Sequence, residues 1–420
     1  MKMVGGEVIA KILATSRHHR IVLLKVFAFV ALITVLFAAT LAIAPAMEHV
    51  SGQQALDFAK QMGVTSMSLW NVTGPAKDRF QYELGVFLRG VELLSETTQD
   101  QKYLDFIKFK IDRFVTDNGT INTYKFNEFQ LDSILTGRLL LTLFKSTGAL
   151  KYKTAADILR EQLRKQPRTN EGGFWHKDVY PYQMWLDGLY MAEPYYARYA
   201  KEFDDRSAFD DIAAQFIIME NRTRNETTGL LYHGYDEARV QAWADPLTGC
   251  SPSIWGRSVG WFAMGVLDTL EFFPVDHPKR SEMVAILNRI ASAVKRFQDA
   301  QSGLWWQVMD KGGEAGNYLE SSASAMFVYT LAKGIRLAYL SKDDYLDSAL
   351  KGYDGIVAHF VDSGPDGGVN YLRTVSVGGL GGKPYRDGSY EYYLSEAVVT
   401  NDPKGIGPFI MACVEIFRVS

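Results

Sequence analysis

The sequence predicts an all-α protein whose helices pair into hairpins and close into a barrel. Helical periodicity is the first indication. Between 76 and 96, Phe80, Leu84, Phe87 and Val91 recur at three- and four-residue steps and form one apolar stripe. Short turns containing Gly, Pro, Asn and Asp separate such segments, which is typical of consecutive helical hairpins. Further helices are expected over 103–115, 127–147, 152–166, 182–201, 205–221, 255–273, 280–300, 321–340 and 343–361.

A recurring glycine-led motif is the second indication. The stretches GGFWHK, GLLYHG, GLWWQV and GGVNYL begin at Gly172, Gly229, Gly303 and Gly367. Each reads as a tight turn into a short β segment that carries aromatic and polar side chains. Measured from Gly173, Gly229, Gly303 and Gly368, the spacings are 56, 74 and 65 residues, close to one helical hairpin plus a loop. A closed ring of about six hairpins, an (α/α)6 barrel over 50–420, explains these features, and an open helical solenoid is the alternative.

Composition places the chain among ordinary globular proteins. It has 420 residues, of which 47% are hydrophobic and 22% charged, and its net charge is −3. This charge gives no general basic field, so a nucleic-acid partner is not expected. Aromatic residues make up 13% of the chain, a high share that suits sugar-stacking clefts as well as hydrophobic cores.

The N-terminal 50 residues differ from the rest. The 19 residues of 26–44 contain no charge, which approaches the length of a membrane span. The basic residues in 1–25 predict that this stretch stays cytosolic, or forms the first region of a signal peptide, while the remainder is translocated. Two interpretations follow: an uncleaved transmembrane signal anchor, or a signal peptide cleaved after Ala44. The barrel would then face the extracellular or lumenal side, or be secreted.

Two features bear on that translocation. Four Asn-x-Ser/Thr sequons begin at Asn71, Asn118, Asn221 and Asn225, so we expect a glycoprotein in a eukaryotic secretory route. The cysteines are Cys250 and Cys413, which allow at most one disulfide within the chain. Their spacing does not say whether they pair, and the hydrophobic core must supply most of the stability.

Asp187 is the first candidate catalytic residue. It lies in HKDVYPYQMWLDGLYMAEP, early in a helix expected to begin near Pro181, among Trp, Met and Leu side chains. Apolar surroundings disfavour an ionised carboxylate and favour a general acid that is still protonated near neutral pH. A structural aspartate paired with a nearby cation is the competing interpretation.

Asp132 is a second acidic residue, on an otherwise apolar stretch expected to be helical. It precedes Asp187 by 55 residues, about one repeat, so neighbouring hairpins could bring both to one mouth of the barrel. A capping or helix-dipole role is the alternative for Asp132.

Several basic and aromatic residues could bind a ligand at the same mouth. His176 and His233 occupy equivalent places in two glycine-led loops. Trp255 and Trp261 flank Arg257, an arrangement that suits a sugar carboxylate, although a cation–π contact in the core would use the same residues. No motif with metal-ligand or nucleotide-loop spacing occurs, so neither a metal nor another cofactor is expected.

Three motifs resemble glycoside hydrolase family 105, the unsaturated rhamnogalacturonyl hydrolases. They are HKDVYPYQMWLDGLYMAEP, IWGRSVGWFAMGVLD and YEYYLSEAVVTNDPKGIGPFIMA, and the resemblance extends from about residue 55 to the C-terminus. It implies an (α/α)6 barrel that removes a 4,5-unsaturated uronic acid from the non-reducing end of lyase-generated pectin fragments. It also implies hydration of the C4=C5 vinyl ether, begun by a proton placed on C4.

The resemblance also assigns roles to residues. Asp187 matches the proton donor, and Asp132 matches the acid that helps to hold the sugar and water. His233, Trp255, Arg257 and Trp261 match positions that line the subsite of the unsaturated sugar, and His176, Lys177 and Trp185 fall beside it. Ser258 and Val259 replace the Gly-Asn pair common after this arginine, which leaves the identity of the uronide open. The alternatives are an unsaturated glucuronyl hydrolase acting on other polyuronides and a non-catalytic sugar-binding barrel. The oligomeric state is not indicated.

Overall fold

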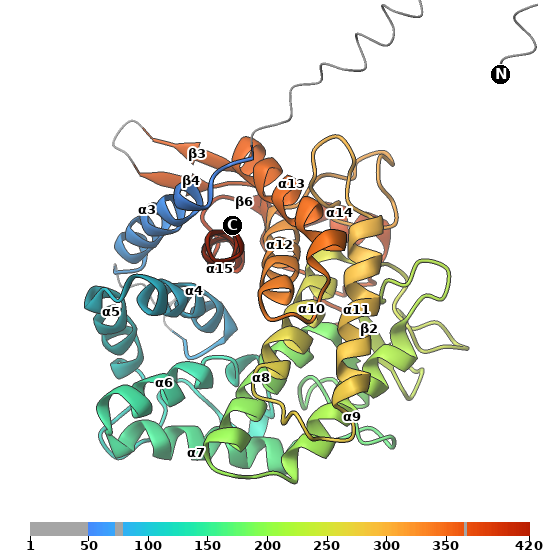
Figure 1. Ribbon diagram of the computed structural model, residues 1–420. Helices are drawn as coiled ribbons and strands as arrows, with labels where there is room; N and C mark the ends of the chain where they lie inside the picture. The colour runs from blue at the N-terminus through green and yellow to red at the C-terminus, as the bar shows by residue number, and fades with distance from the viewer. Residues whose placement is uncertain (1–48, 72–78, 365–367) are drawn as a thin grey trace, which may run out of the picture. The chain divides into compact units, whose positions relative to one another are not determined.

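The computed structural model describes residues 49–71, 79–364 and 368–420. Helices dominate this part of the chain, and they form two concentric rings (Figure 1). The predicted (α/α)6 barrel is confirmed. The inner ring consists of α4 (Tyr82–Thr98), α6 (Gly137–Thr147), α8 (Leu186–Glu202), α10 (Gly256–Leu270), α12 (Ser321–Arg336) and α15 (Pro403–Val419).

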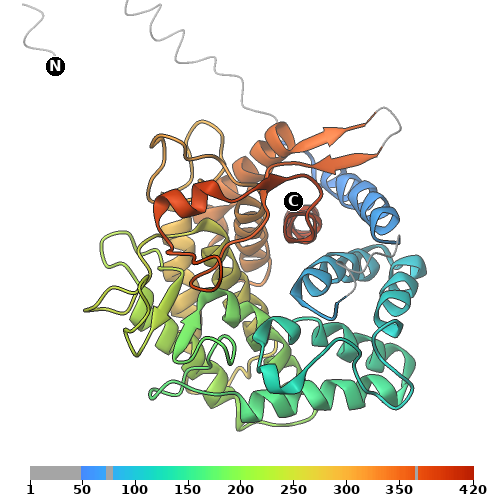
Figure 2. The ribbon, with the colours of Figure 1, turned by 180° about the vertical axis from the view of Figure 1, so that it is seen from behind.

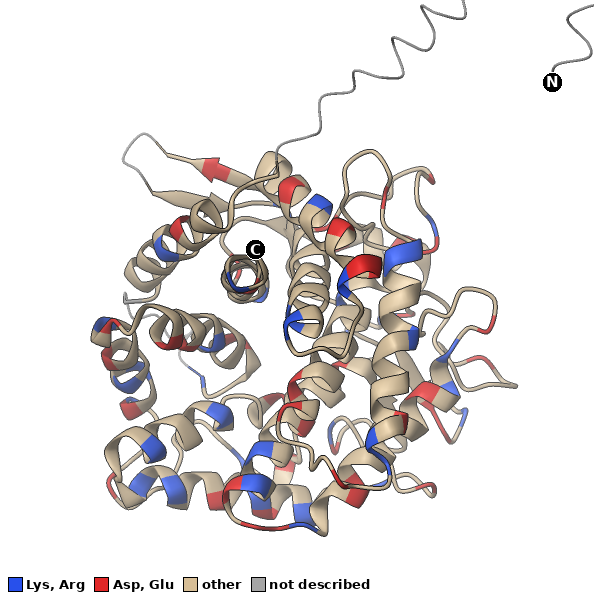
Figure 3. Cartoon of the chain, in the orientation of Figure 1, with Lys and Arg blue, Asp and Glu red and all other residues tan. Residues whose placement is uncertain are grey.

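The outer ring supplies one partner for each inner helix. These helices are α3 (Gly52–Asn71), α5 (Gln101–Asp112), α7 (Leu150–Lys165), α9 (Ala208–Thr223), α11 (Arg280–Arg296) and α13 (Lys342–Phe360). Every residue of α10 is buried, whereas α7 buries one face only, which is the pattern expected for inner and outer helices. Acidic and basic residues are scattered over the outer helices in the view of Figure 3.

The two ends of the described chain close the ring. The last helix, α15, packs against α12 on one side and α4 on the other, and α3 serves as its outer partner. The α4–α15 contact is close because of glycine. A Cβ on Gly407 would lie 2.4 Å from the backbone oxygen of Val86, and one on Gly90 would lie 3.0 Å from the Gly407 oxygen. These glycines therefore let the two helices approach more closely than alanine would allow.

Buried charges link the inner helices inside the barrel. Arg138 on α6 and Lys333 on α12 lie 2.8 Å and 2.7 Å from the carboxylate of Asp268 on α10. The Tyr329 hydroxyl donates to the same carboxylate at 2.6 Å. Burial alone would raise the pKa of Asp268, but the two cations hold it well below its usual range. Both cations contact this carboxylate, and removing one partner would leave an uncompensated buried charge.

Tight turns follow the outer helices, as the recurring motif predicts. Gly172, Gly229 and Gly303 have positive φ, and the chain then pairs back on itself, for example between Arg168 and Phe174 and between Arg224 and Leu231. The turn at Gly119 with the Val115–Ile121 bridge is a further example that the sequence motif did not include. These turns lie in the connections that run from each outer helix to the next inner helix.

The same outer-to-inner connections are long and cover one end of the barrel. β1 (Gln183–Trp185) pairs with β2 (Gly234–Asp236), and β5 (Thr374–Val375) pairs with β6 (Val398–Val399). β3 (Val361–Ser363) and β4 (Val369–Tyr371) form a third antiparallel pair. Seen from behind, the orange-to-red segment after α13, which includes α14 (Tyr390–Ser395), lies over this end of the ring (Figure 2).

The structure corrects two sequence predictions and answers one open question. Residues 127–136 are not part of a long helix but form two 3-10 turns, η1 (Phe126–Glu128) and η2 (Leu131–Ser133), before α6. The helix that carries Asp187 begins at Leu186, after β1, and not near Pro181. Cys250 and Cys413 are both buried and unpaired with each other.

The predicted membrane segment, 26–44, lies outside the described residues, as does all of 1–25. Within the part of the chain that the structure describes, no helix combines the length and apolar character needed to cross a membrane.

Candidate active site

A two-strand pairing places Asp187 beside His233. In the β1–β2 register Trp185 lies opposite Gly234, and the Leu186 backbone N–H donates to the His233 oxygen at 3.0 Å. Asp187 follows at once in the first turn of α8, where its Oδ2 lies 2.9 Å from His233 Nε2. The Asp187 side chain is 13% exposed and that of His233 is fully buried.

The Asp187–His233 contact is close but imperfectly aligned. Although the atoms are 2.9 Å apart, neither His233 Nε2 nor Asp187 Oδ2 makes a hydrogen bond of good geometry within the described structure. Catalytic hydrogen bonds are often poorly aligned before substrate binds and tighten in the complex. The two side chains are therefore close without forming a well-aligned structural ion pair.

Trp185 is held between two rings. His176 stacks on it at 4.5 Å and Tyr180 at 4.8 Å between ring centroids, while His233 meets its edge at 5.4 Å. Trp185 is only 4% exposed. The ring thus contacts both histidines that lie near Asp187.

Asp132 lies in η2 and is held as a carboxylate. Lys177 Nζ is 2.6 Å from its Oδ2, and His176 Nε2 is 3.4 Å from its Oδ1. Burial opposes ionisation, but Lys177 and then His176 outweigh it, so the pKa of Asp132 falls below its usual value. Burial lowers the pKa of His176 to about 4, which leaves that imidazole neutral near pH 7.

Gly188 brings the two acidic centres together. A Cβ at this position would lie 3.1 Å from His176 Nδ1 and 3.1 Å from Leu131 Cδ1. The start of α8 therefore packs directly against His176 and Leu131. His176 contacts Asp132, and Leu131 precedes Asp132 in the chain. A glycine after Asp187 is what allows this approach.

Trp255 and Arg257 lie at the start of α10, across the site from Asp187. The Trp255 ring is 4.9 Å from the His233 ring and stacks on Tyr393 at 5.6 Å. Arg257 sits 5.0 Å from the Trp255 ring, is 1% exposed, and donates to the Val375 oxygen at 2.5 Å and to Ser322 Oγ at 3.3 Å. The structure therefore gives Arg257 protein partners as well as the predicted contact with Trp255.

Trp261 lies one turn deeper in α10. It is 1% exposed, belongs to the main hydrophobic core, and stacks on Tyr190 at 4.9 Å. Its edge contact with Tyr82, at 6.4 Å, connects it to the mouth of the barrel. Seven of the predicted residues thus lie close together, namely Asp132, His176, Lys177, Trp185, Asp187, His233 and Trp255. Arg257 and Trp261 lie behind them.

Sequence reasoning missed three residues of this region. Tyr393 contacts His233, with its hydroxyl 2.7 Å from Nδ1. Gln307 joins Trp255 to Tyr393, because its Oε1 accepts from Trp255 Nε1 at 3.2 Å and its Nε2 donates to the Tyr393 oxygen at 3.0 Å. Tyr82 meets the Trp261 ring edge-on at 6.4 Å. Tyr393 belongs to one of the three quoted motifs, but nothing in its spacing indicates a partner 160 residues away.

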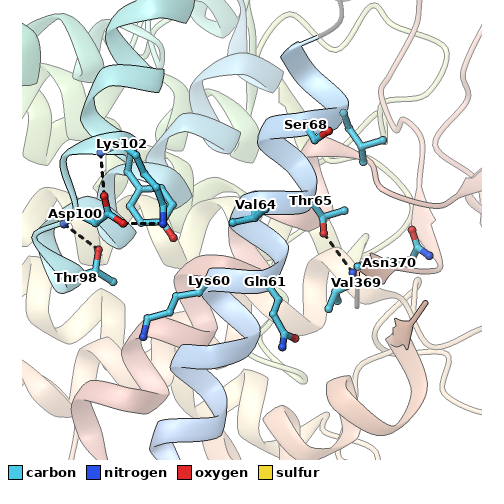
Figure 4. Close-up of a pocket in the computed structure, with 13 residues that line it drawn as sticks. Lys60, Gln61, Val64, Thr65, Ser68, Thr98, Asp100, Lys102, Val369 and Asn370 are labelled. Carbon is cyan, nitrogen blue, oxygen red and sulfur yellow. Dashed lines mark hydrogen bonds and ion pairs between the residues drawn. The ribbon is translucent and has the colours of Figure 1, made fainter. Parts of the chain in front are cut away.

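A second hollow on the molecule lies apart from these residues. A groove of about 690 Å³ runs between α3, the start of α5 and β4 (Figure 4). Its lining is mostly surface polar groups, such as Lys102, which pairs with Asp100 at 2.7 Å, and Thr65, which accepts from the Val369 N–H at 3.3 Å. None of the predicted catalytic or binding residues lines it. Among the described residues no group of three or more His, Cys, Asp or Glu is placed to hold a metal ion.

The Asp132–Lys177 pair yields a pH-dependent prediction. We expect Lys177→Gln to destabilise the protein by about 2 kcal/mol at pH 7, because it leaves a mostly buried carboxylate unpaired. Asp132 has a depressed pKa in the folded protein, so its pairing stabilises the fold above the unfolded pKa and this contribution is lost as pH falls. The loss should therefore be smaller at pH 3 than at pH 7, measured by denaturant unfolding.

Lys102→Gln is the matched control. Lys102 pairs with Asp100 at a similar distance, but both side chains are about half exposed. Surface pairs contribute about 0–1 kcal/mol. Equal losses for the two variants at pH 7 would contradict a buried role for Lys177.

Comparison with known proteins identifies the family. A family model described as Glycosyl Hydrolase Family 88 matches residues 56–420. An unsaturated rhamnogalacturonyl hydrolase of Bacillus subtilis, YesR, is 32% identical over 247 residues, which cover 57% of this chain and 67% of that protein. Protein Atu3128 of Agrobacterium fabrum is 38% identical over 230 residues, which cover 54% of this chain and 97% of that protein.

Solved structures agree with the family model. A family 105 glycoside hydrolase of C. acetobutylicum superposes with a TM-score of 0.83 and 45% identity, covering 86% of this chain and 99% of its own. An unsaturated glucuronyl hydrolase specific for heparin shares the fold, with a TM-score of 0.65 and 15% identity over 87% of this chain and 98% of its own. The chain belongs to Glycosyl Hydrolase Family 88 as that model defines it, and within it to glycoside hydrolase family 105.

Proposed function

We propose that this glycoside hydrolase removes a 4,5-unsaturated uronic acid from the non-reducing end of rhamnogalacturonan oligosaccharides. The observation that carries the proposal is the Asp187–His233 contact at the mouth of the barrel, with Asp132 held as a carboxylate beside it. The similarity to the B. subtilis unsaturated rhamnogalacturonyl hydrolase supports this substrate class. The glucuronyl hydrolase is similar at the level of the fold alone.

The direction of the inner helices suits an anionic substrate. Asp187 lies at the N-terminus of α8, Arg257 at that of α10, and Ser322 at that of α12. Because an outer helix returns the chain after each inner one, the inner helices run in the same direction and their N-termini meet at one mouth. Helix N-termini carry partial positive charge and favour carboxylates. The uronate carboxylate would thus be bound where this charge converges.

Asp187 acts as the general acid in the proposed reaction. Its proton is transferred to C4 of the vinyl ether, and positive charge develops at C5 and on the ring oxygen. A water then adds at C5, its proton is taken up by a carboxylate, and the resulting hemiketal opens and releases the aglycone. The apolar wall of Trp185 and Trp255 limits competing water around the acid.

Asp132 and its cation are assigned to holding the sugar and the water. With a depressed pKa it remains ionised while Asp187 donates, so the two carboxyl groups have different tasks. Lys177 neutralises part of its charge and adds a donor at the rim, since its side chain is 20% exposed. Arg257, buried behind Trp255, contributes positive charge and supports the ring rather than presenting a free guanidinium.

The assay follows the double bond. The full-length protein is incubated with rhamnogalacturonan oligosaccharides made by a lyase, and the loss of ultraviolet absorbance from C4=C5 is recorded beside release of the aglycone. Unsaturated glucuronyl disaccharides form the comparison arm. Faster turnover of the glucuronyl disaccharides would overturn the substrate class, and no turnover of any unsaturated oligosaccharide would overturn the function.

Asp187→Asn is expected to lower kcat by about 10²–10⁴, because the amide keeps the shape of the side chain but cannot donate the proton. Asp178→Asn, in the same loop but exposed, is the matched control and should stay within twofold of wild type. Binding of substrate should persist in the Asp187 variant. An Asp187→Asn enzyme with activity within threefold of wild type would exclude this residue as the acid.

We also propose that residues 26–44 direct the barrel into a secretory route, as an anchor or a cleaved peptide. Of the sequons whose side chains the structure describes, Asn118 suits glycosylation best. It is exposed in a turn, where Thr120 Oγ1 donates to its side-chain oxygen at 3.0 Å. Asn225, by contrast, uses its amide nitrogen to donate to the Tyr232 hydroxyl at 2.8 Å. Asn221 is exposed within α9.

In a eukaryotic secretory host, Asn118→Gln should therefore abolish one mobility shift on glycosidase treatment, whereas Asn225→Gln should change nothing. Electrophoresis before and after deglycosylation measures both. A full-length protein whose mobility never responds to the glycosidase would contradict the proposed translocation.

A further inference from the structure

Tyr393 is the hydrogen-bonding partner that the structure places at Nδ1 of His233. It sits in α14, is fully buried, and places its hydroxyl 2.7 Å from His233 Nδ1. Its ring stacks on Trp255 at 5.6 Å. The contacts line up in order, from the Tyr393 hydroxyl to the two nitrogens of His233 and then to Oδ2 of Asp187 at 2.9 Å.

The hydroxyl decides which nitrogen of His233 carries the proton. Burial raises the pKa of Tyr393 well above its usual value, so the phenol keeps its proton. Among the described residues, His233 Nδ1 is the acceptor within reach of that O–H. A buried donor without an acceptor costs free energy comparable to a lost hydrogen bond. The arrangement is satisfied when Tyr393 donates to a bare Nδ1, which leaves the proton of the neutral ring on Nε2.

We propose that Tyr393 is a positioning residue: it holds His233 in the tautomer that presents an N–H to Asp187. This inference rests on the proposed role of Asp187 as the acid. The Nε2–H then lies beside Oδ2, 2.9 Å between the heavy atoms although not aligned as a hydrogen bond, and the transferable proton of Asp187 is left on Oδ1. Once that proton has moved to C4, the N–H stabilises the carboxylate that remains. In the opposite tautomer a bare Nε2 would instead compete with the substrate for the proton.

The surroundings fix this chain of contacts mechanically. Gln307 donates to the Tyr393 main-chain oxygen at 3.0 Å and accepts from Trp255 Nε1 at 3.2 Å, so it sets the spacing of the stacked rings. Ser389 caps α14 by accepting from the Tyr392 N–H at 3.1 Å. Tyr393, Trp255, Val308 and Val375 form a separate small hydrophobic cluster at this place.

Other titratable groups also face these residues. His176 lies in the loop before β1 and interacts electrostatically with Asp187 and His233. Asp132 and Lys177 also act on His176. Tyr392, Arg386 and Asp387 act on Tyr393 from its own segment. All of them are retained when only the Tyr393 hydroxyl is removed, so a change in pH dependence reports on that hydroxyl.

The test is Tyr393→Phe in the full-length protein, assayed on lyase-generated unsaturated rhamnogalacturonan oligosaccharides. The ring and its stacking on Trp255 remain, so KM should stay within about twofold while kcat falls about tenfold. Because a donor aimed at a carboxylate favours its ionised form, losing the donor should move the alkaline limb of the kcat profile to higher pH. A variant with kcat within twofold of wild type and an unmoved alkaline limb would overturn the proposal.

Tyr392→Phe is the matched control. Its hydroxyl accepts from the Gly379 N–H at 3.0 Å, whereas the Tyr393 hydroxyl contacts His233. This variant should keep the wild-type kcat profile, and thermal unfolding of both variants shows whether the fold survives. Equal losses of kcat and equal pH profiles in the two variants would mark Tyr393 as merely structural.

A spectroscopic measurement separates this inference from the proposed function. With ¹⁵N-labelled histidine, the ring shifts of His233, assigned by their disappearance in His233→Gln, report the tautomer without any substrate. The wild type should show the Nε2–H form at neutral pH, and Tyr393→Phe should lose this single form. An Nδ1–H tautomer or an imidazolium in the wild type would overturn the role of Tyr393, whether or not the enzyme hydrolyses the expected sugars.

Discussion

The short antiparallel pairing of β1 with β2 is the contact on which the site depends. It spans three residues on each strand, and it joins the segment entering α8 to the segment leaving α9. Trp185 lies opposite Gly234 in this pairing. Asp187 lies two residues after Trp185, and His233 lies one residue before Gly234, so the pairing brings Asp187 and His233 close together. A shift of one residue in this register would turn these side chains to opposite faces.

The barrel gives this pairing a rigid base. α8 and α10 pack side by side in the inner ring, so that the Trp255 and Tyr393 rings face His233 from across the mouth. Closure depends on α15, whose glycines permit contact with α4. The cost of burying charges inside the barrel is offset by the ion pairs of Arg138 and Lys333 with Asp268. The acidic residues at the mouth keep partial exposure and therefore remain accessible to a substrate.

Much of the fold could be predicted from the sequence because it rests on local patterns. Apolar stripes give the helices, and the positive-φ glycines give the tight turns at Gly172, Gly229 and Gly303. α15 was not among the predicted helices, since Gly405, Gly407 and Pro408 argue against a helix locally. Its packing against α4 overrides that preference, and packing between distant segments cannot be read from periodicity.

The site was predictable to the extent that its chemistry is local. Asp187 stands out because a single acid occurs among Trp, Met and Leu, and His233 because it repeats the place of His176. The environment of Asp132 was missed, since the 3-10 turn that holds it reads as part of an apolar helix. Tyr393 and Gln307 reach the site only through tertiary contacts. The burial of Arg257 likewise depends on Val375 and Ser322, which lie far along the chain.

The central claim is that a side chain delivers a proton to C4, and a solvent-isotope experiment tests it most directly. In D2O, Asp187 exchanges its proton with solvent before each turnover. The first-formed product should therefore carry deuterium at C4, on one face of the ring, and double-bond absorbance should vanish together with release of the aglycone. Mass spectrometry and NMR at early times detect this label before enolisation can scramble it. Release of the aglycone without deuterium at C4 would contradict the account and indicate direct hydrolysis at the anomeric carbon.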